Sequence, residues 1–229
     1  MSRVDGKIGV VTGGTQGLGA AVAWQLARSG AAGLVTCGRN AAKGNAVAQA
    51  IREETGCDVR FVQADLGVAT DVRTVVAAAD KSFGRVDMLV NAAGITDRGD
   101  ILTTDEALFD RMFAINTRAP FFLMQDTIRI MVREGTPGTI VNIGSGQSLL
   151  PNAPERTAYA ASKGGVLNLT RALAADLPLP VIAAGGLMDG HDARQALSWG
   201  AVAVQMGTAF IGCPESGADA VMALPAEAF

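Results

Sequence analysis

Residues 7–19 read KIGVVTGGTQGLG, and this stretch decides the fold class of the 229-residue chain. Residues 7–11 form a short apolar run that predicts a strand, and small apolar residues recur at helical spacing from residue 20 onward. Between the two, Gly13, Gly17 and Gly19 form a GxxxGxG turn. The missing side chains let backbone N–H groups and a helix N-terminus approach a pyrophosphate. The order of strand, glycine turn and helix therefore predicts a dinucleotide-binding α/β domain.

Strand and helix patterns alternate regularly after this turn. We expect further strands at residues 33–37, 59–63, 86–90 and 139–143, and helices at 41–54, 71–83, 103–133 and 157–177. Asn116 lies inside the long third helix, and Pro120 predicts a bend in it. Such alternation is typical of a doubly wound parallel sheet, here a single Rossmann-like domain.

Composition limits the kinds of partner that this protein can have. The formal net charge is −3 and the Lys and Arg residues are scattered, so we expect neither a nucleic acid nor a membrane as partner. No apolar run approaches the roughly 18 residues that span a bilayer, and the N-terminus lacks the apolar segment of a signal peptide. Cys37, Cys57 and Cys213 are widely spaced, which predicts reduced thiols and no metal site. We expect a cytoplasmic protein.

The end of the second strand bears on the choice of nucleotide. A dinucleotide fold places the adenosine ribose there, and an acidic residue binds a free 2'-hydroxyl. Gly38 stands where that acid is expected, and Arg39 offers a guanidinium to a 2'-phosphate. This predicts NADP(H) rather than NAD(H), the alternative being that Arg39 is a solvated loop residue.

Two further loops are expected at the same edge of the sheet. Asp65 follows the third strand and could accept a hydrogen bond from the adenine amine, and residues 91–94 (NAAG) form a small-residue loop suited to lying under a nucleotide. The expected nucleotide-binding residues are Gly13, Thr15, Gln16, Gly17, Leu18, Gly19, Arg39, Asp65, Leu66, Asn91, Ala92, Gly94, Tyr159 and Lys163.

Residues 157–163 (TAYAASK) place the only tyrosine, Tyr159, one helical turn before Lys163. The two side chains share a helix face, and a positive charge favours the phenolate, lowering a tyrosine pKa that is about 10 when unperturbed. Ser145 follows the fifth strand, so its hydroxyl can converge on the pair. Asn116 is a poor mid-helix residue, and its amide could bind a main-chain carbonyl or a water. The alternative is an ordinary half-buried aromatic and a solvated lysine.

Together, the glycine turn, Asp65, the NAAG loop, Asn116, Ser145 and the Tyr159-x-x-x-Lys163 pair resemble the short-chain dehydrogenases/reductases over about residues 5–177. The resemblance implies that Tyr159 is the general acid/base and that Ser145 binds the substrate carbonyl. It implies that Lys163 lowers the tyrosine pKa and holds the nicotinamide ribose, while Asn116 holds a proton-relay water. It also implies a homodimer that pairs through the long helices.

The chain departs from that family after residue 177. Residues 180–190 (PVIAAGGLMDG) and 201–210 (AVAVQMGTAF) are instead similar to the last two βα units of the nitronate monooxygenase (2-nitropropane dioxygenase) family, which are FMN-binding (β/α)8 barrels. By this resemblance, four residues match FMN-phosphate positions: Gly185, Gly186, Gly207 and Thr208. The other barrel strands and the catalytic histidine segment are missing, so FMN is not an expected cofactor. His191, the only histidine, is expected at the surface.

We interpret the chain as a chimera, engineered or recombined, that joins near residue 178. Residues 181–184 and 201–206 would then add strands six and seven beyond strand five, giving one seven-stranded parallel sheet in the order 3-2-1-4-5-6-7.

Three functional hypotheses follow from this reading. The first is an active NADPH-dependent carbonyl reductase acting on an unknown small substrate. The second is a hybrid that keeps the nucleotide site but has weak or no turnover, because the segment that closes over substrate is replaced. The third is a binder of phosphate or FMN phosphate through the barrel-derived loops. The sequence favours the second.

Overall fold

The computed structural model describes residues 4–96, 98–148, 154–177, 182–184, 194 and 203–205. The strands are β1 (Ile8–Thr12), β2 (Gly33–Gly38), β3 (Asp58–Gln63), β4 (Met88–Asn91), β5 (Thr139–Asn142), β6 (Ile182–Ala184) and β7 (Ala203–Gln205). The helices are α1 (Gly17–Arg28), α2 (Ala41–Thr55), α3 (Ala69–Phe83), α4 (Glu106–Phe113), the π-helical turn η1 (Ala114–Arg118), α5 (Ala119–Glu134), the 3-10 turn η2 (Gly146–Ser148) and α6 (Thr157–Asp176). Element type agrees with the sequence prediction from β1 to α6, with boundaries shifted by a few residues.

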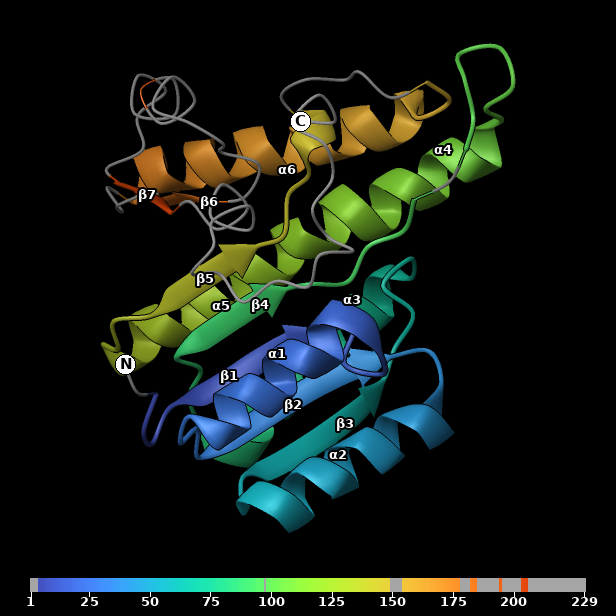
Figure 1. Cartoon of the computed structure of the whole chain (residues 1–229). Coiled ribbons are helices and arrows are strands. Elements are labelled where there is room, and N and C mark those ends of the chain that lie inside the picture. Colours follow the sequence, from blue (N-terminus) through green and yellow to red (C-terminus); the bar gives the residue numbers. More distant parts are fainter. Residues whose placement is uncertain are drawn as a thin grey trace, which may run out of the picture.

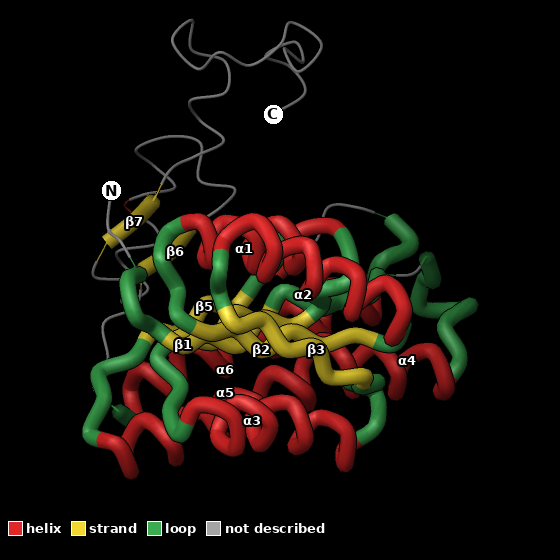
Figure 2. The backbone as a smooth tube through the Cα atoms, turned by 90° about the horizontal axis from the view of Figure 1, so that it is seen from below, coloured by secondary structure: helices red, strands yellow, loops and turns green. Residues whose placement is uncertain are grey.

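The first five strands form one parallel sheet in the order β3-β2-β1-β4-β5. In register, Ile8 of β1 faces Gly33 of β2, and Gly9 faces Met88 of β4. Helices α1 and α2 cover one face, and α3, α5 and α6 cover the other (Figure 2). All five residues of β1 are buried, as expected for a central strand that is covered on both faces.

Two apolar clusters hold the layers together. One lies between the sheet and helices α3 and α5 and includes Val10, Val75, Leu89 and Leu123. The other lies under α1 and α2 and includes Ala23, Leu34, Ile51 and Val59. Because the five strands pair in parallel, their carboxyl ends all lie at the same edge of the sheet (Figure 1).

The predicted single seven-stranded sheet is wrong. β6 and β7 pair with each other in parallel, with Ile182 facing Ala203, and form a separate two-stranded sheet. Both runs do form strands, of three residues each, but β6 is hydrogen-bonded to β7 and not to β5. Ile182, the first residue of β6, is 63% exposed.

The predicted long helix at residues 103–133 is three consecutive segments. Asp105 caps α4 by accepting a hydrogen bond from the Leu108 N–H at 2.7 Å. The hydrogen-bond pattern of the helix then changes at η1, where the Ala119 N–H donates to the Ala114 carbonyl five residues earlier instead of four. The irregularity therefore begins before Pro120, where the bend was predicted. Pro120 has no N–H for the carbonyl four residues earlier, which is that of Asn116.

No helix within the described ranges is both long and apolar enough to cross a membrane.

Candidate active site

The glycine turn after β1 packs directly on the loop after β4. The Thr12 hydroxyl accepts a hydrogen bond from the Ala93 N–H at 2.9 Å. Gly13 has a φ of 76°, and a Cβ on it would lie 3.2 Å from the Ala93 Cα. The two loops at the centre of the carboxyl edge therefore form one continuous backbone surface.

Helix α1 begins against this surface with no room for a side chain at Gly19. A Cβ there would lie 2.5 Å from the Gly13 carbonyl oxygen and 2.6 Å from that of Thr12. Gln16 at the N-cap makes no side-chain capping bond, and the first turn carries no acidic residue. A glycine-lined helix N-terminus without a cap or a carboxylate suits an anion such as a pyrophosphate.

Arg39 lies exposed at the end of β2. Its carbonyl accepts a hydrogen bond from the Gln63 amide at 3.2 Å, and its guanidinium forms no ion pair with the described residues. A Cβ on Gly38 would lie 2.6 Å from the Thr15 Cγ2, so an acidic side chain at Gly38 would displace Thr15. This end of β2 thus presents an exposed cation, and a carboxylate at Gly38 would fit only if Thr15 moved.

Asp65, the predicted adenine contact, is already engaged within the protein. One carboxylate oxygen accepts the Gly67 N–H at 2.9 Å, and the other lies 3.1 Å from the Arg111 Nη2. Partial desolvation raises the pKa of this carboxyl, but the Gly67 N–H and the nearby Arg111 and Arg39 guanidiniums outweigh it, so the pKa lies below its usual value. Leu66 is buried in the core, so its side chain is not available to a nucleotide.

Asn91 uses its amide to connect three elements. It is 4% exposed, and its Nδ2 donates to Asn142 of β5 at 2.8 Å. Asn142 in turn donates to the Thr170 hydroxyl of α6 at 2.9 Å. The NAAG loop is therefore tied to both β5 and α6.

Lys163 reaches from α6 to the same edge. Its Nζ donates to the Ile143 carbonyl, just after β5, at 2.7 Å. A Cβ on Gly94 would lie 3.5 Å from this nitrogen, so the NAAG loop passes directly beside it. Burial lowers the pKa of the Lys163 ammonium. The ammonium therefore lies between the ends of β4 and β5. Its partner Ile143 precedes Ser145 by two residues in the chain.

Ser145, in the loop after β5, and Tyr159, in the first turn of α6, are both half-buried. The Ser145 hydroxyl accepts the Gln147 N–H at 3.2 Å. The Tyr159 hydroxyl forms no hydrogen bond with the described residues. Lys163 thus binds the end of β5, two residues before Ser145 in the chain, and it follows Tyr159 by one helical turn. Hydrogen bonds between catalytic groups often form only when substrate is bound.

Asn116 in η1 is 1% exposed, and its amide is fully used. Its Oδ1 accepts the Ile95 N–H at 2.9 Å, and its Nδ2 donates to the Ile95 carbonyl at 2.9 Å. The second Nδ2 hydrogen goes to the Ser162 hydroxyl at 3.0 Å. Sequence reasoning missed Ser162, although a serine three residues after Tyr159 on a helix was a usable signal.

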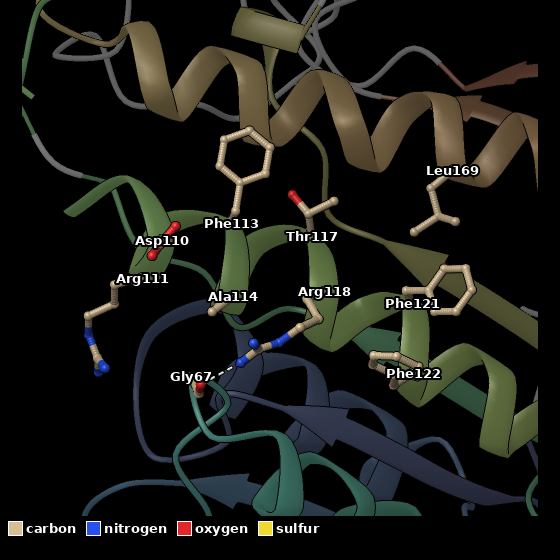
Figure 3. A pocket seen from close by; sticks show the side chains of 10 residues that line it. All are labelled: Gly67, Asp110, Arg111, Phe113, Ala114, Thr117, Arg118, Phe121, Phe122 and Leu169. Atoms are coloured by element: carbon tan, nitrogen blue, oxygen red, sulfur yellow. Dashed lines mark hydrogen bonds between the residues drawn. The ribbon is translucent and has the colours of Figure 1, made fainter. Parts of the chain in front are cut away.

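A hollow of about 780 Å³ lies between η1, the adjoining turns of α4 and α5, and Leu169 of α6. Figure 3 shows Phe113 and Thr117 directed toward α6, while Arg118 reaches Gly67, to whose carbonyl it donates at 2.6 Å. None of Asn116, Ser145, Tyr159 and Lys163 lines it. It is lined instead by Gly67 and Arg111, the two partners of Asp65, so it lies on the side of the predicted adenine contact.

Several predicted residues lie outside the described ranges: Gly185, Gly186, His191, Gly207, Thr208 and Cys213. Cys37 and Cys57 are buried and free, and burial raises the pKa of each thiol to about 11. No group of residues that could hold a metal ion occurs among the described ones.

The sequence model of the short chain dehydrogenases matches residues 7–188. The chain belongs to the short chain dehydrogenase family. The model of the nitronate monooxygenases also matches residues 152–226, so the two matches overlap at residues 152–188.

Curated relatives of this short chain dehydrogenase include elsinochrome reductase 1 of Elsinoe fawcettii, 31% identical over 81% of this chain and 70% of that protein. An uncharacterized oxidoreductase of Thermotoga maritima is 36% identical over 75% of this chain and 66% of its own length. The chain thus spans about two thirds of these relatives.

Solved structures show the same fold. A short-chain dehydrogenase from Sphingobium yanoikuyae in complex with NADPH has a TM-score of 0.70 and 30% identity, covering 78% of this chain and 70% of that one. A metagenomic short-chain oxidoreductase in complex with NADP has a TM-score of 0.75 and 27% identity, covering 90% of this chain and 98% of its own.

Proposed function

We propose that this short chain dehydrogenase is an NADP(H)-dependent oxidoreductase that interconverts a carbonyl compound and its alcohol. The observation that carries the proposal is the position of Lys163. Its ammonium lies against Gly94 and the end of β5, one helical turn from the only tyrosine and beside the loop that bears Ser145. A phenol next to a buried ammonium at a nucleotide-binding edge is suited to proton transfer.

The residues present fit a dinucleotide with a 2'-phosphate. The turn at Gly13, Gly17 and Gly19 leaves space for a pyrophosphate. Arg39, which forms no ion pair with the described residues, is exposed at the end of β2, where the ribose is expected. The complexes of two structural relatives with NADPH and NADP support the same choice. NADPH, when bound, supplies the hydride.

The protein's own groups would then handle the carbonyl oxygen. Ser145 donates a hydrogen bond to it, and Tyr159 delivers the proton. Lys163 stabilises the phenolate by its charge and binds ribose hydroxyls. Both hydrogens of the Asn116 side-chain amide are already donated, so this amide cannot donate to a water. The main-chain carbonyl of Asn116 would accept the N–H of residue 120 in an α-helix, but Pro120 has no N–H. We propose that this carbonyl, and not the amide, holds the relay water.

A second candidate is a hybrid with weak or no turnover. The nitronate monooxygenase match over residues 152–226 supports a C-terminal part of barrel origin. Such a part would lack the segment that shields the reaction from water. Phosphate binding through Gly185, Gly186, Gly207 and Thr208 remains a prediction on residues outside the described ranges.

We also propose a homodimer that pairs through α4, α5 and α6. Phe109 and Phe121 are 44% and 43% exposed on this surface. Sedimentation of the full chain as a monomer would contradict it.

The test is a screen of small ketones and aldehydes by NADPH absorbance, repeated with Tyr159→Phe. This variant keeps the ring and removes the transferable proton, so turnover should fall at least about 100-fold while NADPH affinity stays within about twofold. Turnover that survives in Tyr159→Phe would show that another group is the acid. Absence of turnover in the unmutated chain, with NADPH bound, would favour the hybrid.

A further inference from the structure

The hydroxyl of Ser162 is buried inside α6 and joins two elements of the candidate site. It is 0% exposed, it donates to the Tyr159 carbonyl at 2.8 Å, and it accepts from the Asn116 Nδ2 at 3.0 Å. The side-chain amide of Asn116 also accepts from the N–H and donates to the carbonyl of Ile95, in the loop that follows β4. A continuous chain of hydrogen bonds therefore runs from this loop through η1 to the backbone of Tyr159.

A second bond fixes the same residue from the other side. The Thr117 hydroxyl donates to the Ser162 carbonyl at 2.9 Å. Consecutive residues of η1 thus hold the side chain and the main chain of Ser162. The helix turn is wider at η1, because its geometry is π-helical. Asn116 and Thr117, which are consecutive in this turn, both bind Ser162 of α6.

We propose that Ser162 is a positioning residue for the Tyr159 phenol, an inference that rests on the proposed function. Tyr159 and Lys163 keep their mutual spacing because they share a helix. The helix alone does not determine where the two side chains lie relative to the loop at residues 91–95, over which the nicotinamide is expected to lie. The hydrogen bonds from Asn116 through Ser162 to Tyr159 determine this position. Small displacements of a reacting group cost large factors in rate.

The chain offers a matched control in Thr170, two helical turns further along α6. Its hydroxyl donates to the Val166 carbonyl at 2.8 Å and accepts from the Asn142 Nδ2 at 2.9 Å. Thr170→Ala therefore removes the same two kinds of bond as Ser162→Ala, from the same helix, away from the tyrosine. Both variants should lower the unfolding midpoint to a similar extent.

The experiment compares the two variants in the full chain by turnover and by NMR. Ser162→Ala should lower kcat about tenfold, change the shape of the pH–rate profile and leave KM for NADPH within about twofold. Thr170→Ala should leave the shape of the pH–rate profile as in the unmutated chain and should raise KM for NADPH, because the Thr170 hydroxyl binds Asn142, which in turn binds Asn91 of the NAAG loop. Because Tyr159 is the only tyrosine, selective ¹³Cζ labelling yields one resonance that reports its surroundings without any turnover. That resonance should shift in Ser162→Ala and stay in place in Thr170→Ala.

The NMR readout separates this proposal from the proposed function. If the resonance shifts only in Ser162→Ala and the unmutated chain reduces no carbonyl, the positioning role of Ser162 is supported and the proposed reductase function is wrong. An unchanged resonance and pH profile in Ser162→Ala, or equal effects in Thr170→Ala, would show that Ser162 serves stability alone and would overturn the positioning role.

Discussion

Arg39 carries the choice between the two nicotinamide nucleotides in the proposed site. It is an exposed cation without an ion pair among the described residues, and Thr15 occupies the space that an acid at Gly38 would need. A charge-assisted bond to a 2'-phosphate is stronger than one between neutral groups. The nucleotide preference therefore depends on one guanidinium and on the exclusion of one carboxylate.

Arg39→Ala should narrow the preference for NADPH over NADH by roughly 1.5 to 3 kcal/mol, the worth of a hydrogen bond to a charged group. Calorimetric titration with both nucleotides measures it. Arg28→Ala is the control, because Arg28 is also exposed but lies at the far end of α1, paired with Glu54. Equal affinities for the two nucleotides in the unmutated chain would show that Arg39 is only a solvated loop residue.

At the scale of elements, the N-terminus of α1 and the end of β1 act as one unit. Gly19 permits the contact, since any Cβ there meets two backbone carbonyl oxygens that cannot rotate away. The helix must therefore move if this residue gains a side chain, and the proposed phosphate site moves with it.

Gly19→Ala should lower the free energy of unfolding by about 1–3 kcal/mol, as for an overpacked core, and weaken NADPH binding at least about tenfold. Denaturant unfolding and nucleotide titration measure the two effects. Gly164→Ala in α6 is the opposite control. The nearest atom to its added Cβ is 3.9 Å away, so better helix propensity should stabilise the protein by about 0.5–1 kcal/mol. Unchanged NADPH affinity in Gly19→Ala would mean that the turn does not bind the nucleotide.

For the whole molecule, Asp87 holds the other end of the sheet together. It is 2% exposed, its carboxylate accepts the Ile8 N–H at 2.8 Å, and it pairs with Arg85 and Lys7. Desolvation raises the pKa of this carboxyl, but the bonds from Arg85 and Ile8 and the charge of Lys7 outweigh it, so the pKa lies below its usual value. The resulting stability is present above the unfolded aspartate value of about 3.9 and is lost as the pH falls through the lower folded value.

Asp87→Asn should lower the free energy of unfolding at neutral pH by about 1.5–3 kcal/mol and flatten its decline below pH 4 or so. Urea unfolding across a pH series measures both. Asp58→Asn, which alters an exposed pair with Arg60, should change neither by more than about 0.5 kcal/mol. An equally steep decline in Asp87→Asn would assign the acid sensitivity to other carboxylates.

The sequence by itself determined the βα order through α6, the glycine turn and the shared face of Tyr159 and Lys163. These depend on neighbours within a few residues, whose spacing already dictates helix, strand or turn. Tertiary structure alone decided that β6 pairs with β7, that Thr15 fills the space beside Gly38, and that Ile95 and Ser162 saturate Asn116. Each of these contacts joins residues about twenty or more positions apart, so it depends on the path of the folded chain, which no local pattern records.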